Sequence, residues 1–108
     1  MTLNEYQTHA LKTRIYPPDI DGINYSLMSL LGEVGEIANK YKKVLRGDYQ
    51  TRTEWDSMIG AELGDALWYM AVLAHELGFT LKEIALLNQE KLASRRRRNV
   101  IQGSGDDR

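Results

Sequence analysis

The chain has 108 residues, 43% hydrophobic and 27% charged, values that suit one small globular domain spanning residues 1–108. It contains no cysteine, which excludes disulfides and thiolate metal sites. The net charge of −1 argues against a general polyanion binder, and no apolar run approaches the roughly 18 residues that cross a bilayer. The N-terminus lacks a basic-then-apolar signal, so we expect a soluble, cytoplasmic protein.

Hydrophobic spacing predicts a first helix over residues 3–14 and a second over residues 23–45. The double proline at 17–18 separates them, and Gly47 ends the second. The second helix is strongly amphipathic, which predicts that one face is buried. Its apolar stripe consists of Leu27, Leu30, Leu31, Val34, Ile37, Ala38, Tyr41 and Leu45.

A third helix is expected to begin at a Thr53-x-x-Asp56 capping signal and to close at Gly78. A full capping box, from Thr80 to Glu83, predicts the start of a fourth helix, followed by a polar tail over 99–108. The sequence has no strand-like alternation, so the predicted class is all-α. The apolar positions of the third helix are Ile59, Leu63, Ala66, Leu67, Met70, Leu73, Ala74 and Leu77; those of the fourth are Ile84, Leu87 and Leu92.

The second and third helices each carry a pair of acids at the same spacing, Glu33 with Glu36 and Glu62 with Asp65. Positions three apart lie about 60° apart on one face of a helix, so antiparallel packing can bring four carboxylates together. Two like charges about 4 Å apart repel by roughly 4 kcal/mol at an effective dielectric near 20, so such a cluster needs cations. Oxygen ligands select Mg²⁺ or Mn²⁺, which predicts phosphate-ester or anhydride hydrolysis.

A single Glu-x-x-Glu pair usually marks only a solvated helix edge, and that alternative applies to each pair alone. Two matched pairs on two long helices favour a metal site. Gly32, Gly35 and Gly64 flank the acids, although glycine inside a helix costs roughly 1 kcal/mol relative to alanine. Their presence predicts either a close approach of the helices or room for a ligand.

The chain resembles the MazG-like nucleotide pyrophosphohydrolases of the all-α NTP pyrophosphatase superfamily. The resemblance lies in the stretch "LLGEVGEIANKYKK" and in the segment that runs from "AELGDALWYM" to "GSGDDR". The family signature is E-E-x-x-E followed by E-x-x-D. Glu33 and Glu36 match the last two acids of the first motif, and Glu62 with Asp65 matches the second. Gly32 replaces the first acid of the double glutamate, which removes one potential ligand.

The resemblance implies a four-helix MazG-like bundle completed by homo-oligomerisation, as a dimer or tetramer, with the site partly built at a subunit interface. It implies Mg²⁺-dependent hydrolysis of a nucleoside triphosphate to the monophosphate and pyrophosphate, with a house-cleaning role in nucleotide pools. We expect Glu36, Glu62 and Asp65 to bind the metal, and Glu33, also a ligand candidate, to orient or deprotonate the attacking water. The sequence leaves open which carboxylate is the base.

The resemblance also implies that Asn88, Lys91 and Arg95 bind the nucleotide, and these residues follow one helix face at i, i+3 and i+7. Tyr69, one turn after Asp65, is a candidate for stacking on the base or contacting the ribose, with packing at a subunit interface as its alternative. Interface packing is the favoured interpretation for Trp68. Lys42 and Lys43 are either surface lysines or phosphate contacts.

Two rival functions can be compared with this interpretation. A di-iron carboxylate bundle requires Glu-x-x-His, and neither His9 nor His75 follows a glutamate by three. A non-enzymatic helical interaction module is the alternative function, binding nucleic acid or a protein partner through the arginines at 95–98. Within the superfamily, dUTP, dCTP and phosphoribosyl-ATP all remain open as substrates.

Overall fold

The computed structural model describes residues 1–108 and consists of four helices without strands. The helices are α1 (Leu3–Lys12), α2 (Gly22–Leu45), α3 (Arg52–Glu76) and α4 (Leu81–Arg97). The all-α prediction is therefore confirmed, and each helix lies close to its predicted position. None of the four is both long and apolar enough to span a bilayer.

A threonine and a glutamate three residues later form a capping box at the start of α1, α3 and α4. For α4 this is the predicted box of Thr80 and Glu83. For α3 the predicted start at Thr53 is wrong, because the box is formed by Thr51 and Glu54. The Glu54 carboxylate accepts from two successive backbone N–H groups ahead of the helix, at 2.9 and 3.1 Å.

Glycines and side chains end the helices. Gly47 and Gly78 adopt φ values of +86° and +84°, the left-handed conformation that glycine accepts without strain, as predicted for both helix ends. Helix α1 ends at Lys12, two residues earlier than predicted. The Thr13 hydroxyl donates to the Ala10 carbonyl at 2.9 Å, which caps the last turn.

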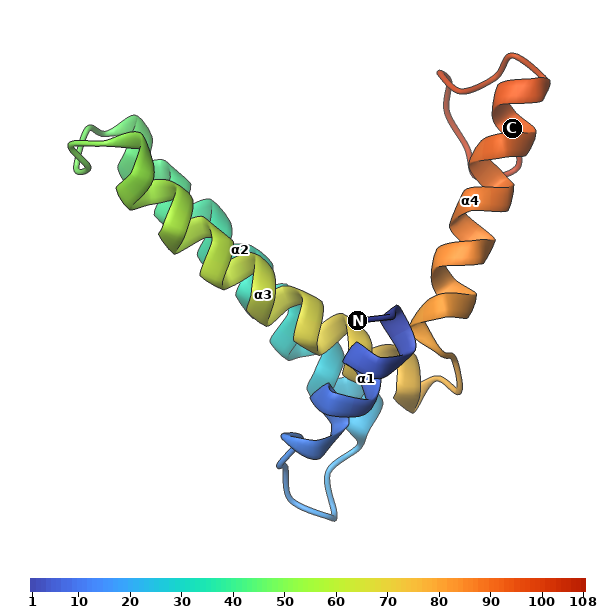
Figure 1. Cartoon of the computed structure of the whole chain (residues 1–108), viewed down its shortest axis with the longest axis horizontal. Coiled ribbons are helices and arrows are strands. Elements are labelled where there is room, and N and C mark those ends of the chain that lie inside the picture. Colours follow the sequence, from blue (N-terminus) through green and yellow to red (C-terminus); the bar gives the residue numbers. More distant parts are fainter.

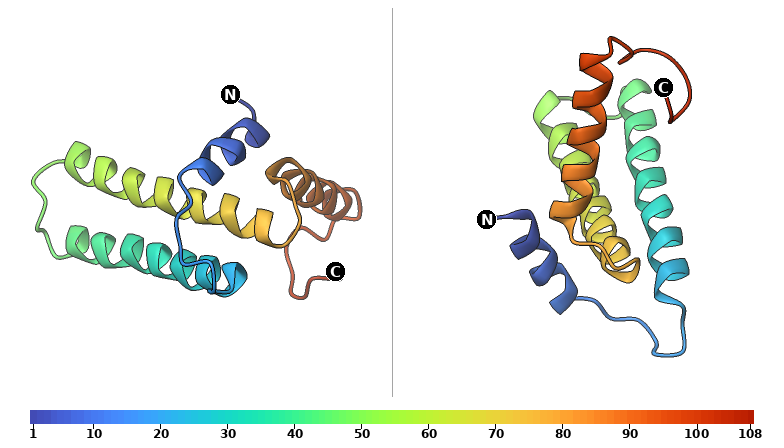
Figure 2. Two further views of the ribbon diagram at one scale, coloured as in Figure 1. Left: turned by 90° about the horizontal axis from the view of Figure 1, so that it is seen from below. Right: turned by 90° about the vertical axis from the view of Figure 1, so that its right-hand side faces the viewer.

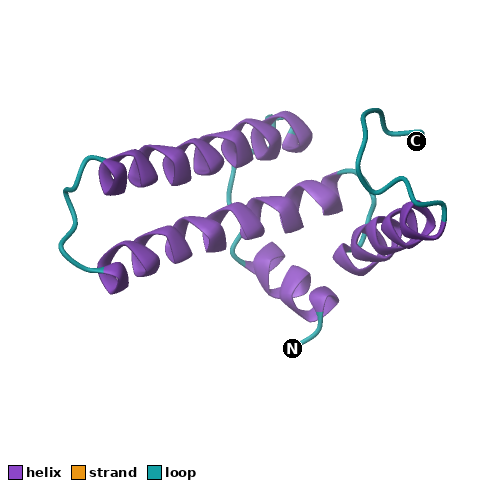
Figure 3. Ribbon diagram, turned by 90° about the horizontal axis from the view of Figure 1, so that it is seen from above, coloured by secondary structure: helices purple, strands orange, loops and turns teal.

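Helices α2 and α3 form a long antiparallel hairpin, as Figures 1 and 3 show. Helix α1 packs across the C-terminal half of α3, and α4 leaves that end in a different direction (Figure 2). Helix α4 contacts α1 and α3 but makes no contact with α2. The chain therefore has two arms, the α2–α3 hairpin and α4, joined where α1 packs.

The buried apolar core lies at this junction and is small. Its central cluster consists of Ala10, Ala71, Ala74 and Leu81, with Tyr6 and Trp68 packed against it. Ala66 and Val72 of α3 are the other buried apolar residues. The Trp68 indole N–H donates to the Thr13 hydroxyl at 2.8 Å, and this bond joins α3 to the end of α1. Helix α1 of the same chain covers part of the Trp68 ring, and the packing of Trp68 at a subunit interface stays a prediction.

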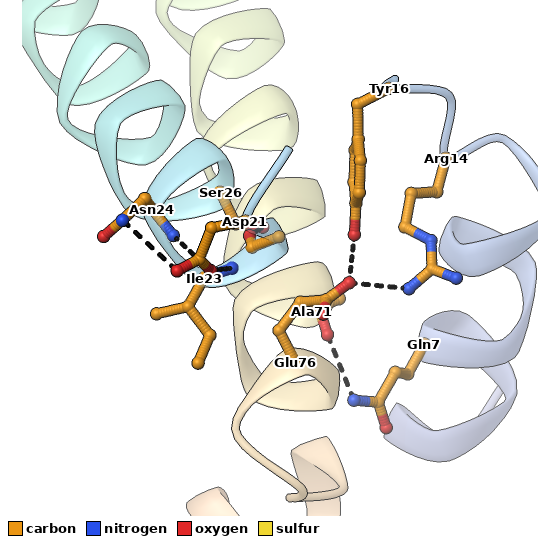
Figure 4. A network of polar contacts seen from close by, with 10 residues as sticks. Gln7, Arg14, Tyr16, Asp21, Ile23, Asn24, Ser26, Ala71 and Glu76 are labelled. Carbon is orange, nitrogen blue, oxygen red and sulfur yellow. Dashed lines mark hydrogen bonds and ion pairs between the residues drawn. The ribbon is translucent and has the colours of Figure 1, made fainter. Parts of the chain in front are cut away.

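Polar groups hold the loop between α1 and α2 against α3 (Figure 4). The Glu76 carboxylate accepts from the Tyr16 hydroxyl and, at 2.8 Å, from the Arg14 guanidinium. Gly22 lies directly beside this group, and a Cβ there would be 2.5 Å from the Glu76 Cδ. A side chain at position 22 would therefore have to displace the Glu76 carboxylate and the Tyr16 hydroxyl.

The single chain is more open than a globular protein of its size. Its radius of gyration is 17.0 Å, whereas about 13 Å is typical of this length. Its accessible surface is 7920 Å² for a mass of 12.3 kDa, roughly 1,800 Å² more than the usual scaling with mass gives. Only ten of the 108 residues are buried.

The predicted apolar stripes lie on the expected helices, but much of their area faces solvent in the single chain. The stripe of α2 was expected to be buried, and α3 covers only part of it. The exposed members of the predicted α2 stripe are Leu27, Leu31, Val34, Ala38, Tyr41 and Leu45. Those of the other stripes are Leu63, Leu67 and Met70 of α3, Leu77 directly after α3, and Ile84, Leu87 and Leu92 of α4.

Gln7 provides a test of how the junction is held together. Its buried side-chain amide donates to the carbonyls of Ala71 and Phe79 at 3.1 and 3.0 Å and accepts from the Leu81 N–H at 3.1 Å. We expect Gln7→Leu to lower the free energy of unfolding by roughly 2 kcal/mol or more, because it leaves buried backbone groups unpaired. Urea denaturation at fixed protein concentration measures this change. The control Gln50→Leu alters an exposed side chain, and equal stability of the two variants would contradict the assigned role of Gln7.

Candidate metal and nucleotide site

Three carboxylates meet where α2 and α3 face each other. One oxygen from each of Glu33, Glu62 and Asp65 lies within 4.8 Å of the other two. Glu62 and Asp65 are one turn apart on α3, and antiparallel pairing places Glu33 of α2 beside both. Glu62 is buried, Glu33 is half-buried and Asp65 is exposed, so the cluster opens to solvent on one side.

The cluster perturbs the ionisation of Glu33. Partial burial, followed by the negative charges of Asp65 and Glu62, raises the pKa of Glu33 above its ordinary value of 4.5. A hydrogen bond with Glu62 and the charge of Glu36 act in the same direction. Burial and neighbouring charges thus oppose the ionised form of Glu33, the candidate base, and raise its pKa.

Lys40 lies against the cluster, one turn after Glu36 on α2. Its ammonium group forms a hydrogen-bonded ion pair with Glu62 Oε1. This hydrogen bond is the main reason that the pKa of Lys40 is raised. Sequence reasoning missed Lys40, although its position seven residues after Glu33 places it on the same helix face.

Glu36 is exposed and is not among the three clustered carboxylates. Its role as a metal ligand therefore stays a prediction. The glycines beside the acids, Gly32, Gly35 and Gly64, have open space where a Cβ would lie. Close approach of α2 and α3 within the chain therefore does not explain them, and room for a ligand stays a prediction.

The three carboxylates suit a hard divalent cation. Two oxygens bound to one Mg²⁺ at about 2.1 Å lie at most about 4.2 Å apart, and flexible glutamate and aspartate side chains cover the small remaining difference. A divalent ion there would also relieve the repulsion that raises the pKa of Glu33. Glu33, Glu62 and Asp65 are therefore the residues of this chain that fit such an ion.

The predicted nucleotide-binding residues of α4 lie away from this cluster. Asn88 and Lys91 are exposed on the α4 arm, which makes no contact with α2 within the chain (Figure 1). Arg95 is buried instead beneath the C-terminal tail, where its Nη2 donates to the Asp106 carbonyl at 2.8 Å. Its Nε is also buried but has no hydrogen-bond partner. Within one chain, these α4 residues therefore do not lie beside the acidic cluster.

Aromatic residues lie close to the acids on the α1 side. Tyr69 is half-buried and meets Trp68 edge-on, with ring centroids 4.7 Å apart. Its proposed contact with the nucleotide stays a prediction. Burial and the charge of Asp65 raise the pKa of Tyr6, so α1 places a phenol near the cluster that sequence reasoning did not identify.

Comparisons with known proteins agree with this arrangement. The family model described as the MazG nucleotide pyrophosphohydrolase domain matches residues 24–100, a range that contains both acidic pairs and the three α4 residues. The Gene 37 protein of Mycobacterium phage L5 is 46% identical over 114 residues, and the match covers 100% of both chains. No solved structure matches the chain.

The raised pKa of Glu33 predicts how metal-free stability depends on pH. A carboxyl whose pKa is higher in the folded state stabilises the fold while protonated, and this contribution is lost as the pH rises above 4.5 through the folded pKa. In EDTA, we expect Glu33→Gln to melt at a higher temperature than the parent chain at pH 7 and to lose this advantage toward pH 4.

Thermal melts followed by circular dichroism, at matched protein concentration, measure this effect. Glu90→Gln, at an exposed position of α4, is the control. Added Mg²⁺ should remove the advantage of Glu33→Gln. A melting difference independent of both pH and Mg²⁺ would contradict the electrostatic origin.

Proposed function

Because the chain belongs to the MazG nucleotide pyrophosphohydrolase family, we propose that it hydrolyses nucleoside triphosphates to the monophosphate and pyrophosphate with Mg²⁺. The observation that carries this proposal is the approach of Glu33, Glu62 and Asp65 to within 4.8 Å across two helices. Mn²⁺ is the expected substitute ion. Removal of unwanted nucleotides from the cytoplasmic pool is the corresponding role.

In the proposed reaction, water adds to the α-phosphorus, and the bond from this phosphorus to the oxygen bridging to the β-phosphorus breaks. Glu33, which lies beside Glu62 and Asp65 across the two helices, accepts the proton of the water. Glu62 and Asp65 hold Mg²⁺, with Glu36 as a further candidate ligand. Bound Mg²⁺ would offset the charge of the phosphates and polarise the phosphoryl group.

The rest of the proposed site comes from a second copy of the chain. Asn88, Lys91 and Arg95 do not meet the acids within one chain, so we assign them to the substrate phosphates and sugar across a subunit interface. The excess surface of roughly 1,800 Å² per chain supports this assignment, because obligate dimers bury about 1,000–2,500 Å² per partner. The exposed apolar side chains of α2, α3 and α4 supply that area. Tyr69 is the proposed contact for the base or ribose.

A nucleic-acid-binding role for the arginines at 95–98 has less support. The net charge of −1 gives the chain no general attraction for a polyanion. Arg98 also donates to the Arg108 carbonyl at 2.9 Å, so its guanidinium group is partly bonded within the chain.

The reaction is tested by incubating a panel of ribo- and deoxynucleoside triphosphates with Mg²⁺ and identifying products by phosphorus NMR. We expect pyrophosphate as the product, and Glu62→Gln should lower turnover by about 100-fold or more, because the metal loses a central ligand. Asp56→Asn is a control on the same helix, since Asp56 is half exposed and pairs with Arg52. Orthophosphate as the product, or full turnover by Glu62→Gln, would refute the proposal.

The shared site is tested by mixing two inactive variants. Chains carrying Glu62→Gln lack a metal ligand, and chains carrying Arg95→Gln lack a phosphate-binding group. Refolded together, they should regain part of the turnover that neither shows alone, because some interfaces then pair intact halves. Light scattering during size-exclusion chromatography should report a dimer or tetramer. An active monomer, or mixtures as inactive as their components, would exclude a site made by two chains.

A further inference from the structure

The ion pair between Lys40 and Glu62 differs in its surroundings from the other ion pairs of this chain. The side chain of Glu62 is only 12% exposed, and that of Lys40 is 27% exposed. The pairs Arg46–Asp48 and Arg52–Asp56 lie at the surface, with arginine side chains 60% and 75% exposed. The Arg14–Glu76 pair belongs to the α1–α2 loop anchor. Only Lys40 brings a positive charge onto the clustered carboxylates.

The placement of this charge follows from the helix register. Glu33, Glu36 and Lys40 succeed one another at i, i+3 and i+7 on α2, so they share the face that looks toward α3. Glu62 is therefore approached both by Glu33 and by the Lys40 ammonium group. Lys40 supplies one positive charge to the cluster.

A divalent ion and Lys40 require the same carboxylate. An ion held by Glu33, Glu62 and Asp65 draws on Glu62, whose Oε1 carries the lysine. A lysine side chain has a flexible four-carbon stem and can move its ammonium group by several ångströms. Oxygens that share one Mg²⁺ lie about 3 to 4 Å apart, so phosphate oxygens on such an ion are within reach of an ammonium group that leaves Glu62.

We propose that Lys40 is a phosphate-binding residue of the substrate site, which Glu62 holds in place until ligands arrive. The ammonium group, which pairs with Glu62, would bond to the phosphate chain once the divalent ion and nucleotide are bound. This inference rests on the proposed function for the identity of the ligand. It adds a positive group from the same chain as the acids to those that α4 is proposed to supply.

The test uses binding rather than turnover. Calorimetry measures the affinity of the full chain for Mn²⁺ alone and for pyrophosphate in the presence of Mg²⁺. We expect Lys40→Met to bind pyrophosphate about tenfold more weakly and Mn²⁺ at least as tightly as the parent chain, because a competing cation has been removed from Glu62. Lys40→Arg keeps the charge and should restore pyrophosphate affinity to within about threefold.

Lys12→Met is the matched control, because Lys12 is an exposed helical lysine without an ion pair. Circular dichroism verifies that each variant is folded, and Lys40→Gln replaces Lys40→Met if the latter is not. Pyrophosphate affinity within twofold of the parent chain, or Mn²⁺ binding weakened in parallel, would overturn the proposal and make Lys40 a structural partner of Glu62.

The two proposals fail separately. A chain that hydrolyses no nucleotide, yet loses pyrophosphate affinity when Lys40 is replaced, would refute the proposed reaction and leave the phosphate contact standing. A chain that hydrolyses nucleotides and binds pyrophosphate equally well with methionine at position 40 would refute the role of Lys40 alone.

Discussion

The repulsion among three carboxylates gathered between two helices is the constraint on which the proposed site depends. At separations of about 5 Å and an effective dielectric near 20, each pair of charges costs about 3 kcal/mol. The ion pair of Lys40 with Glu62 reduces this repulsion, and so does the raised pKa of Glu33, which favours its protonated form. The remainder leaves the site with a built-in preference for a cation.

The scaffold around the acids is held more by polar contacts than by a large core. Capping boxes start three of the helices, the Gln7 amide bonds three backbone groups at the junction, and Glu76 anchors the loop before α2. The apolar core is dominated by alanine. A chain with this little buried area is marginal by itself, so association would contribute stability as well as substrate contacts.

Local patterns in the sequence predicted the helices well, because they depend on spacing and capping. The exception at α3 is instructive. Thr53 with Asp56 and Thr51 with Glu54 both resemble a start signal, but the longer glutamate reaches the free N–H groups ahead of the helix, and Asp56 pairs with Arg52. The acidic pairs were visible for the same reason. The i, i+3 spacing placed both acids of each pair on one face, and three of the four meet.

What the sequence did not reveal depends on contacts between distant segments. Nothing in local spacing says that α4 diverges from the hairpin, that the tail covers Arg95, or that Trp68 bonds to Thr13. The partner of Lys40 was hidden because it lies on another helix, 22 positions along the chain. Amphipathic stripes mark the faces that avoid water, but they do not distinguish a face covered by the same chain from one left for another.

The acids lie on two consecutive helices that form a hairpin. The segments that bring them together are therefore close in the sequence and belong to one chain. The α4 arm, by contrast, does not contact α2 within the chain, and in the proposed site it meets the acids only across a subunit interface. If that neighbouring subunit is a second copy, dilution below the dissociation constant would leave subunits that still capture divalent ions but no longer turn over nucleotide. Ion capture and catalysis would then respond differently to protein concentration, and expression level would itself control the enzyme.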